Sequence, residues 1–310
     1  MNIENIANAA QLASALEVSG YPKPGNVHRT ADFEDTTFEQ FIASSIAIGP
    51  ALLDVAKKGF RSGKGLINVT DIGVGKAIMR AINETIKWQS GGNTNLGVVM
   101  LLIPLTAAAG MTLAIEGSIK LIKLRKILSM ILKSTTPKDA LDVYDAILMA
   151  GPKGLGKVKN LDVKNKDSRD KIKREKISLY NIMKLSSGRD NISKEWVTDM
   201  EITFMFGFPH FKRNYKKTRN LNTSTVQTFL HILSRYPDTM VQRIHGRKIA
   251  SEVSMKAMNI IKTGGILTAG GKKHVLRFDE ELRKNGVNPG TTADLVSASL
   301  MVAILNGLRP

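Results

Sequence analysis

The sequence contains no cysteine and few aromatic residues. The absence of cysteine excludes disulfide bonds, thiolate metal sites and thiol nucleophiles. A zinc site would have to use carboxylates and the 5 histidines, whose spacing matches no metal-binding motif. Aromatic residues make up only 5% of the chain, and strand-like alternation is nearly absent, so a β-sheet protein is not expected.

Long apolar runs are also missing. No run reaches the roughly 20 residues that a membrane span needs. The longest, residues 98–109, contains Pro104, and we expect it to form a buried core helix. The N-terminus, residues 1–5, lacks the basic start and apolar stretch of a secretory signal. The sequence therefore predicts a cytoplasmic protein without membrane contact.

Helical periodicity, by contrast, is abundant. The 310 residues with 43% hydrophobic content are enough for a sizeable core. Apolar residues at three- and four-residue spacing predict helices at 4–18, 37–58, 73–89, 96–115, 119–133, 137–149, 169–185, 191–206, 222–235, 247–262, 274–284 and 291–307. We predict an all-α fold, orthogonal or bundle-like, with about 11 to 12 helices in a single domain over residues 1–310.

Positive charge exceeds negative charge. The chain has 45 Lys and Arg residues against 27 Asp and Glu residues, a net charge of +18, and such a field attracts nucleotides, nucleic acids or anionic lipids. Two basic blocks, residues 153–176 and 212–219, stand out. Because stacking aromatics are scarce in them, nucleic-acid binding is the less favoured interpretation. The 153–176 run is either a solvated face or, at its front edge, a loop over phosphates.

A first candidate site follows the first expected helix. Glu17 precedes the segment 21–28, Tyr-Pro-Lys-Pro-Gly-Asn-Val-His. Pro22 and Pro24 hold the backbone extended and Gly25 allows close approach, so Lys23 becomes a cation on a preformed loop. This arrangement suits phosphate binding. The alternative is a helix end followed by a solvated lysine.

A second candidate is the glycine-containing turn at residues 91–97. Asn93, Thr94 and Asn95 can cap the following helix and direct its free N–H groups at an anion. The turn matches neither the Walker pattern nor the Rossmann fingerprint, so it predicts no particular nucleotide fold. Plain helix capping is the alternative.

A third candidate is the turn at residues 288–295. Gly290 and Thr291 lead into a helix, and Asp294 can serve the helix dipole, a divalent metal or both. A weaker stretch contains Asp238 and Arg243, which can simply pair with each other.

Further carboxylates lie on long connections. Asp32 and Asp35 fall in or at the end of the connection at residues 21–35, and Asp71 falls in the one at residues 59–72. Connections of this length in a compact domain are more often functional or disordered than incidental.

Taken together and in this order, these stretches resemble the triphosphoribosyl-dephospho-coenzyme A synthase family, of the CitG and MdcB type. The family's Glu followed by Pro-Lys-Pro-Gly-x-Val looks like Glu17 with residues 22–27. Its Asn-Thr-His-Lys-Gly motif is similar to residues 93–97, and its Asp-Thr stretch with a following Arg is similar to residues 238–243. Its Ser-Pro-Gly-Gly-Ser-Ala-Asp-Leu-Leu ending looks like residues 288–296.

Two departures from the family pattern concern the substrate. Asn95 and Leu96 stand where the family has His and a cation, and residues 151–158 replace a central Ala-Arg-Gly-Glu motif. The chain therefore looks like a divergent, archaeal-type branch. A related enzyme with another nucleotide or pterin-type acceptor is the closest alternative.

The resemblance implies a transfer at the ribose of ATP. The 2′-hydroxyl of dephospho-coenzyme A displaces adenine from C1, which requires a base, protonation of adenine and neutralisation of the triphosphate. Magnesium is expected because ATP normally arrives with it. A nucleic-acid-binding protein and an inactive helical scaffold are the alternatives from other classes, and a homo-oligomer is compatible with the sequence.

The resemblance also assigns expected roles to particular residues. The expected catalytic residues are Glu17, Asp32 and Asp35; the substrate- and phosphate-binding residues are Lys23, Pro24, Gly25, Asn93, Thr94, Asn95, Arg243, Gly290 and Thr291; and the metal ligands are Glu17, Asp71 and Asp294.

Overall fold

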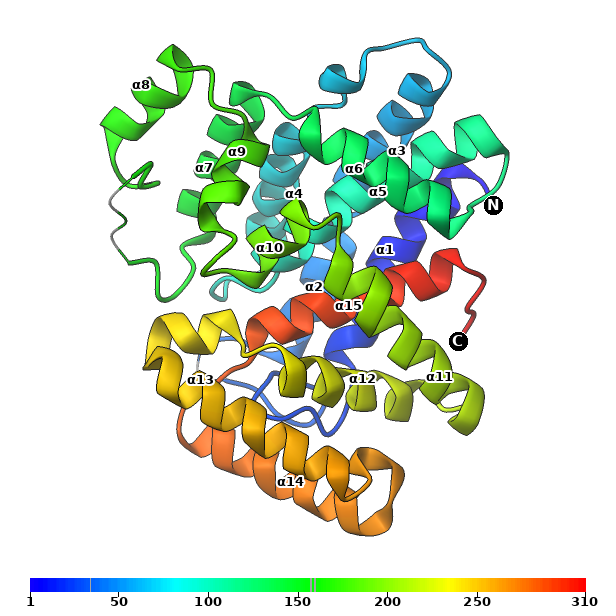
Figure 1. Ribbon diagram of the computed structural model, residues 1–310, viewed down its shortest axis with the longest axis vertical. Helices are drawn as coiled ribbons and strands as arrows, with labels where there is room; N and C mark the ends of the chain where they lie inside the picture. Colours follow the sequence, from blue (N-terminus) through cyan, green and yellow to red (C-terminus); the bar gives the residue numbers. More distant parts are fainter. Residues whose placement is uncertain (34, 157, 159) are drawn as a thin grey trace. The chain divides into compact units, whose positions relative to one another are not determined.

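The described part of the chain is mainly helical. The computed structural model describes residues 1–33, 35–156, 158 and 160–310. Within these residues, helices are joined by irregular loops, and the only β-pairing is a pair of isolated bridges in residues 28–36 (Figure 1). The predicted all-α class is thereby confirmed. Lys157 and Lys159 of the basic run lie outside the described residues.

Most helices lie where apolar periodicity predicts them. Their bounds are α1 (Ile3–Val18), α2 (Phe38–Ala47), α3 (Gly49–Gly63), η1 (Val69–Ile72), α4 (Val74–Trp88), α5 (Leu96–Glu116), α6 (Leu121–Lys133), α7 (Pro137–Ala150), α8 (Lys166–Arg174), α9 (Leu179–Ser186), α10 (Asn191–Val197), η2 (Ile202–Gly207), α11 (Phe208–Thr218), α12 (Leu221–Arg235), α13 (Thr239–Lys262), η3 (Gly265–Leu267), α14 (Ala269–Lys284) and α15 (Gly290–Leu305).

The prediction of about 11 to 12 helices merged several neighbours. The expected helix at 37–58 is two helices, because Pro50 opens α3 and has no N–H with which to continue α2. The expected helix at 169–185 is interrupted at Lys176, which has a left-handed φ of 52°. After α10, Asp199 and Met200 both have a φ of 54°, and the π-helix η2 then leads into α11, which the periodicity missed.

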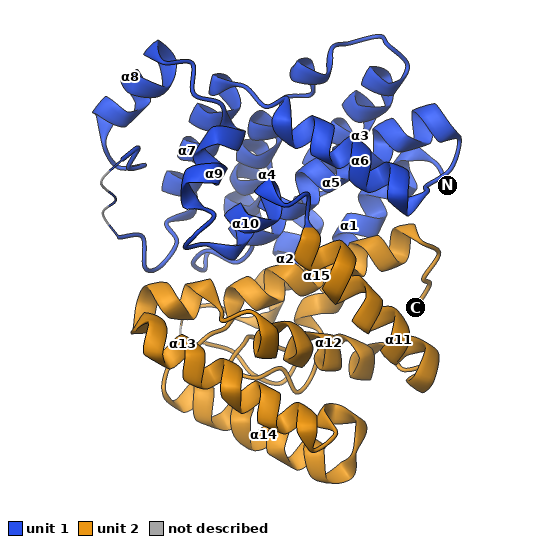
Figure 2. Ribbon diagram, in the orientation of Figure 1, with its two compact units in different colours: residues 1–12, 43–200 blue, residues 13–42, 201–310 orange. Residues whose placement is uncertain are grey.

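The described residues cluster into two compact units (Figure 2). Unit 1 comprises residues 1–12 and 43–200, and unit 2 comprises residues 13–42 and 201–310. The motifs that begin at Glu17, Asp238 and Asn288 all belong to unit 2. The turn before α5 belongs to unit 1. The prediction of a single domain over residues 1–310 stays a prediction.

Unit 1 is built around α5, which packs most extensively against α3. Gly59 on α3 and Gly110 on α5 make this close approach possible. A Cβ at Gly59 would collide with the carbonyl oxygen of Ala107, and a Cβ at Gly110 would collide with that of Ala56. The two backbones are therefore too close for side chains at either glycine.

A proline inside α5 is accommodated by a side chain from α10. Pro104 has no N–H to donate to the carbonyl of Met100, four residues earlier. The indole Nε1 of the buried Trp196 donates to that carbonyl instead, at 3.0 Å. The buried acceptor is thus satisfied and α5 continues through the proline.

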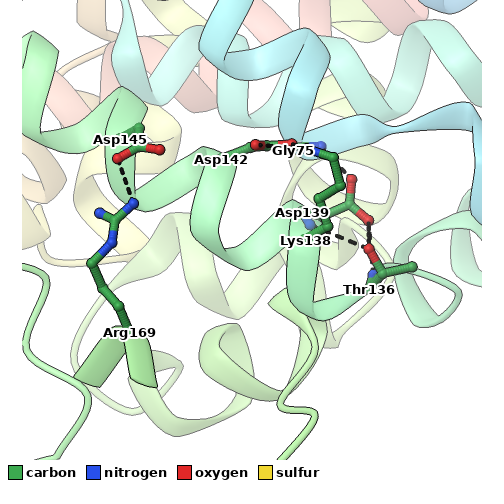
Figure 3. Close-up of polar contacts among 7 residues, drawn as sticks. All are labelled: Gly75, Thr136, Lys138, Asp139, Asp142, Asp145 and Arg169. Atoms are coloured by element: carbon green, nitrogen blue, oxygen red, sulfur yellow. Dashed lines mark hydrogen bonds and ion pairs between the residues drawn. The ribbon is translucent and has the colours of Figure 1, made fainter. Parts of the chain in front are cut away.

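The start of α7 is hydrogen-bonded to the start of α4 within unit 1. Thr136 and Asp139 form a reciprocal capping box, as Figure 3 shows. The other carboxylate oxygen of Asp139 accepts the backbone N–H of Gly75 at 2.8 Å. Further along α7, Arg169 from α8 donates to Asp145 at 2.6 Å. The acidic residues of this helix therefore hold neighbouring segments in place.

Two segments of the described chain are long and apolar enough to cross a membrane by length and composition alone. They are residues 38–63 and α5, and 94% of the most apolar window of α5 is buried. The predicted core helix at residues 98–109 is thereby confirmed. The segment 38–63 is divided between α2 and α3.

Unit 2 is organised around α12. It packs against α11, α13 and α15, while α14 packs against α13 (Figure 1). Its buried apolar residues include Phe229, Leu230 and Leu233. The end of α1 and the irregular segment 19–37 complete this unit.

Candidate functional site

The irregular segment after α1 is anchored to the start of α12. Asn222 accepts the backbone N–H of Tyr21 at 2.8 Å and donates to the Tyr21 carbonyl at 2.5 Å. Arg29 donates to the same Asn222 oxygen at 3.1 Å and to the Ser19 carbonyl at 2.7 Å. The Tyr21–Pro22 peptide bond is cis. The segment thus has a defined course, as its proline content predicts.

The central feature of the site is a buried ion pair between Glu17 and Lys23. Both side chains are almost inaccessible, at 5% and 0% exposed. The Lys23 ammonium donates to Glu17 Oε1 at 2.5 Å and to the Glu17 carbonyl at 3.0 Å. The lysine is therefore not the solvated cation of the alternative interpretation.

Burial acts on the two members of the pair in opposite senses. It raises the pKa of the Glu17 carboxyl, and Lys23 partly offsets this effect. It lowers the pKa of the Lys23 ammonium, which Glu17, Asp294 and Asp279 oppose through their negative charge. The field at Lys23 thus includes two carboxylates from distant parts of the sequence, one of them the predicted Asp294.

The loop that carries Lys23 is seated on α14 and the segment after it. Asp279 accepts the Gly25 N–H at 3.0 Å. Gly25 has a φ of +69°, and a Cβ there would meet the Val287 carbonyl and Leu282. Only glycine fits both the conformation and the space. The predicted close approach at Gly25 is therefore an approach to the protein's own backbone.

The starts of α13 and α15 are joined through a buried aspartate. Asp238 caps α13 by accepting the N–H groups of Met240 and Val241, at 2.9 and 3.0 Å. Its second oxygen accepts both the N–H and the hydroxyl of Thr292, at 2.7 and 2.8 Å. The predicted Thr291 accepts the Met240 N–H at 3.2 Å. These contacts hold the Gly290 turn in place.

Burial also shifts the pKa of the aspartate at this junction. The pKa of Asp238 is raised by burial, against its hydrogen bonds and the positive charge of Arg243. Arg243 itself is exposed on the first turns of α13. It is therefore a cation accessible to a ligand near the buried carboxylate.

The carboxylates of the loop before α2 are placed differently from Glu17. Asp32 is exposed and accepts the Phe38 N–H at 2.8 Å, which caps α2. Asp35 is also exposed. Both lie in unit 2, as Glu17 does, although neither shares its burial.

The predicted turn before α5 lies in unit 1, and its residues have local partners. Asn93 accepts the Leu96 N–H at 3.0 Å, Thr94 bonds the hydroxyl of Ser44 at 2.7 Å, and Asn95 donates to Thr85 at 2.9 Å. The capping interpretation accounts for Asn93. Thr94 and Asn95 are buried.

The predicted metal ligands do not form a single cluster. Asp71 is exposed in η1 of unit 1, whereas Glu17 and Asp294 belong to unit 2. Among the described residues, no group of three or more His, Asp or Glu side chains could hold a metal ion. The described chain thus offers no preformed cage made of protein ligands alone.

Asp279 and Asn222 were missed by sequence reasoning, although both bind the Lys23 loop. Their partners lie far away in the sequence, so spacing alone carries no signal for them. Asn26 donates to Asn288 at 2.9 Å, which joins two of the predicted segments.

The arrangement defines a class of protein. An all-α unit contains a buried carboxylate–ammonium pair with two further carboxylates in its field, and it carries an accessible arginine on α13. Such a centre can exchange protons and bind an anionic small molecule. These are the properties of a helical enzyme that acts on a phosphorylated substrate.

Comparison with known proteins identifies the family. Residues 3–310 match the model of the CitG family, ATP:dephospho-CoA triphosphoribosyl transferase, and the chain belongs to this family. A 2-(5''-triphosphoribosyl)-3'-dephosphocoenzyme-A synthase of Klebsiella pneumoniae is 23% identical over 96% of this chain and 90% of its own length. Protein CitXG of Leuconostoc mesenteroides subsp. cremoris is 24% identical over 99% of this chain and 60% of its own length.

A solved structure shares the fold. The crystal structure of a candidate triphosphoribosyl-dephospho-CoA synthase from Archaeoglobus fulgidus superposes with a TM-score of 0.65, over 86% of this chain and all of that one. The two sequences are 24% identical. The all-α class predicted from helical periodicity is therefore also the class of this solved structure.

Proposed function

We propose that the chain transfers the triphosphoribosyl group of ATP to the 2′-hydroxyl of dephospho-coenzyme A. The hydroxyl oxygen forms a bond to C1 of the ribose as the bond from C1 to adenine breaks. The hydroxyl proton passes to a base, and adenine leaves with a proton. The family match over residues 3–310 is the observation that carries this proposal.

Glu17 is the base in the proposed reaction. Burial raises the pKa of its carboxyl, which brings it closer to the range in which a carboxylate accepts a proton effectively near neutral pH. Lys23 stabilises the carboxylate form at 2.5 Å. Asp32 and Asp35, both exposed in the same unit, are the further carboxylates of the proposal.

Cations and turns supply the proposed phosphate contacts. The exposed Arg243 on α13 binds the triphosphate, and Lys23 adds positive charge from within the protein. The Gly290 turn shapes the site in unit 2. The turn at residues 93–95 belongs to unit 1, and its part in substrate binding stays a prediction.

Magnesium enters the proposal as part of the substrate, Mg·ATP. This ion usually keeps several waters and binds through phosphates and only one or two carboxylates. The half-buried Asp294 can supply one such carboxylate. A cage of three protein ligands, which the described residues do not form, is not needed. Glu17 is the other carboxylate of the proposal in unit 2, and a role of Asp71, which belongs to unit 1, stays a prediction. We place the enzyme in the cytoplasm, where ATP is available.

The acceptor is the least constrained part of the proposal. Asn95 is buried where the family has a histidine, and Leu96 replaces a cation. A different nucleotide acceptor is therefore the second candidate. Nucleic-acid binding is less supported, because the basic helix α8 also carries Asp167 and Asp170 among its cations.

The test is a product assay. The protein is incubated with Mg·ATP and dephospho-coenzyme A, and mass spectrometry follows the acceptor. We expect a product enlarged by one triphosphoribosyl group, together with free adenine. Acceptors with other hydroxyl groups serve as the comparison for the second candidate. Tight duplex-DNA binding at physiological salt, with no modified acceptor, would contradict the proposal.

A further inference from the structure

Asp279 on α14 binds the Lys23 loop at two points. Its side chain is buried, at 7% exposed. Oδ1 accepts the Gly25 N–H at 3.0 Å, and Oδ2 lies 2.9 Å from Nε2 of His28. One carboxylate from a distant helix therefore holds the loop on both sides of Asn26.

The proton on the His28 ring is placed by a neighbour. The backbone N–H of Thr30 approaches Nδ1 at 3.4 Å, and a backbone N–H can only donate. Nδ1 is therefore the acceptor, and Nε2 carries the proton that is donated to Asp279. The ring of Tyr21 contacts the imidazole edge-on at 5.2 Å between centroids. Both oxygens of the Asp279 carboxylate therefore act as acceptors towards the loop.

The Asp279 carboxylate also acts on Lys23 through its negative charge. The charged groups that act on the ammonium are Glu17 from α1, Asp279 from α14 and Asp294 from α15. Glu17 is the direct partner of the lysine. Asp279 combines two contributions, because it acts on the charge of Lys23 and also binds the backbone of the loop that carries it.

We propose that Asp279 is a positioning residue, which fixes the Lys23 loop through Gly25 and His28 and so holds Lys23 beside Glu17. The activity readout of this inference rests on the proposed function, whereas its loop readout does not. It assigns Asp279 no contact with substrate.

Three variants test the two loop contacts. Asp279→Asn weakens the contact with Gly25 and offers no second acceptor oxygen to His28, Asp279→Glu keeps a carboxylate on α14, and His28→Gln changes the imidazole contact alone. Hydrogen exchange of the loop peptides measures positioning. Separate values of kcat and KM for adenine release measure its consequence for the reaction.

For Asp279→Asn, we expect the hydrogen-exchange rate of the Gly25 amide to rise about tenfold or more. This factor corresponds to the weakening of one charge-assisted hydrogen bond. His28→Gln should raise the exchange less, because the contact between Asp279 and Gly25 remains. Asp279→Glu should restore part of the protection. Where the loop is loosened, kcat should fall more than KM rises, because Asp279 does not contact substrate.

An Asp279→Asn protein with unchanged loop exchange would overturn the inference. If this variant does not fold, as judged by circular dichroism, His28→Gln decides, and unchanged loop exchange in that variant would then overturn the inference. Failure of the proposed function is distinguishable, because a wild type without adenine release still yields the exchange results.

Discussion

At the scale of single residues, Glu17 and Lys23 place opposite charges where water has almost no access. Such a pair is costly to bury and is strongly destabilising when only one partner is removed. A close pair of this kind has to be held by its surroundings, and here the surroundings are loop contacts from α12 and α14. The pair is thus a product of tertiary structure, although both residues could be singled out from the sequence.

Glu17→Gln tests the assignment of the base. The amide keeps the size of the side chain and can still accept from Lys23, but it cannot take up a proton. We expect kcat for adenine release to fall by roughly 10²- to 10⁴-fold, with the helical circular dichroism spectrum intact. The exposed Glu252 on α13 offers a matched control, Glu252→Gln. Unchanged turnover in Glu17→Gln would remove this residue from the reaction.

His231 on α12 gives a pH-dependent prediction for stability. Burial lowers its pKa from 6.5 to about 4, with help from His210 and Arg213. Between these values the unfolded chain binds more protons at this residue, so stability falls as the pH drops from 6.5 towards 4. Allowing for partial exposure, the loss is about 2 kcal/mol.

The measurement is urea unfolding at pH 7 and pH 4.5 for wild type and His231→Gln. The variant should lose less stability on acidification, because the suppressed protonation site is gone. The exposed His274 provides the control substitution His274→Gln. Equal acid losses in wild type and His231→Gln would show that the low pKa of His231 has no influence on folding.

At the scale of elements, Trp196 and Pro104 make a prediction about α5. Trp196→Phe leaves the Met100 carbonyl buried without its donor, which should cost about 1–3 kcal/mol. Pro104→Ala returns a backbone N–H to that carbonyl. The cost of Trp196→Phe should therefore be smaller in the Pro104→Ala background.

A double-mutant cycle of chemical unfolding measures this coupling. The cycle removes the volume change of Trp196→Phe, which occurs in both backgrounds. Additive effects would mean that the indole N–H contributes nothing specific at the proline.

Periodicity predicted most elements but not their interruptions. A helix such as α5 is visible because its apolar pattern is long and local. The break before α3 follows from Pro50, which is readable, whereas the left-handed residues Asp199 and Met200 are not glycines and carry no local signal. The expected helix beginning at residue 247 corresponds to the second part of α13, because Gly246, with a φ of 88°, interrupts α13 immediately before it.

At the scale of the whole molecule, the candidate site draws on sequence positions that ordered motifs had already marked. Glu17, Lys23, Asp238 and Asp294 all fall within unit 2. Sequence order could indicate this set because the motifs resemble those of the family in the same order. It could not indicate that Lys23 is buried, or that Asp279 supports its loop, because both depend on packing between distant helices.

The most direct test of the account is acceptor-dependent adenine release in a single turnover. Excess enzyme is mixed with Mg·ATP, with or without dephospho-coenzyme A, and adenine is measured by chromatography. The account predicts about one adenine for each ATP when the acceptor is present, and almost none without it or with Glu17→Gln. Adenine release that ignores both the acceptor and Glu17 would contradict it.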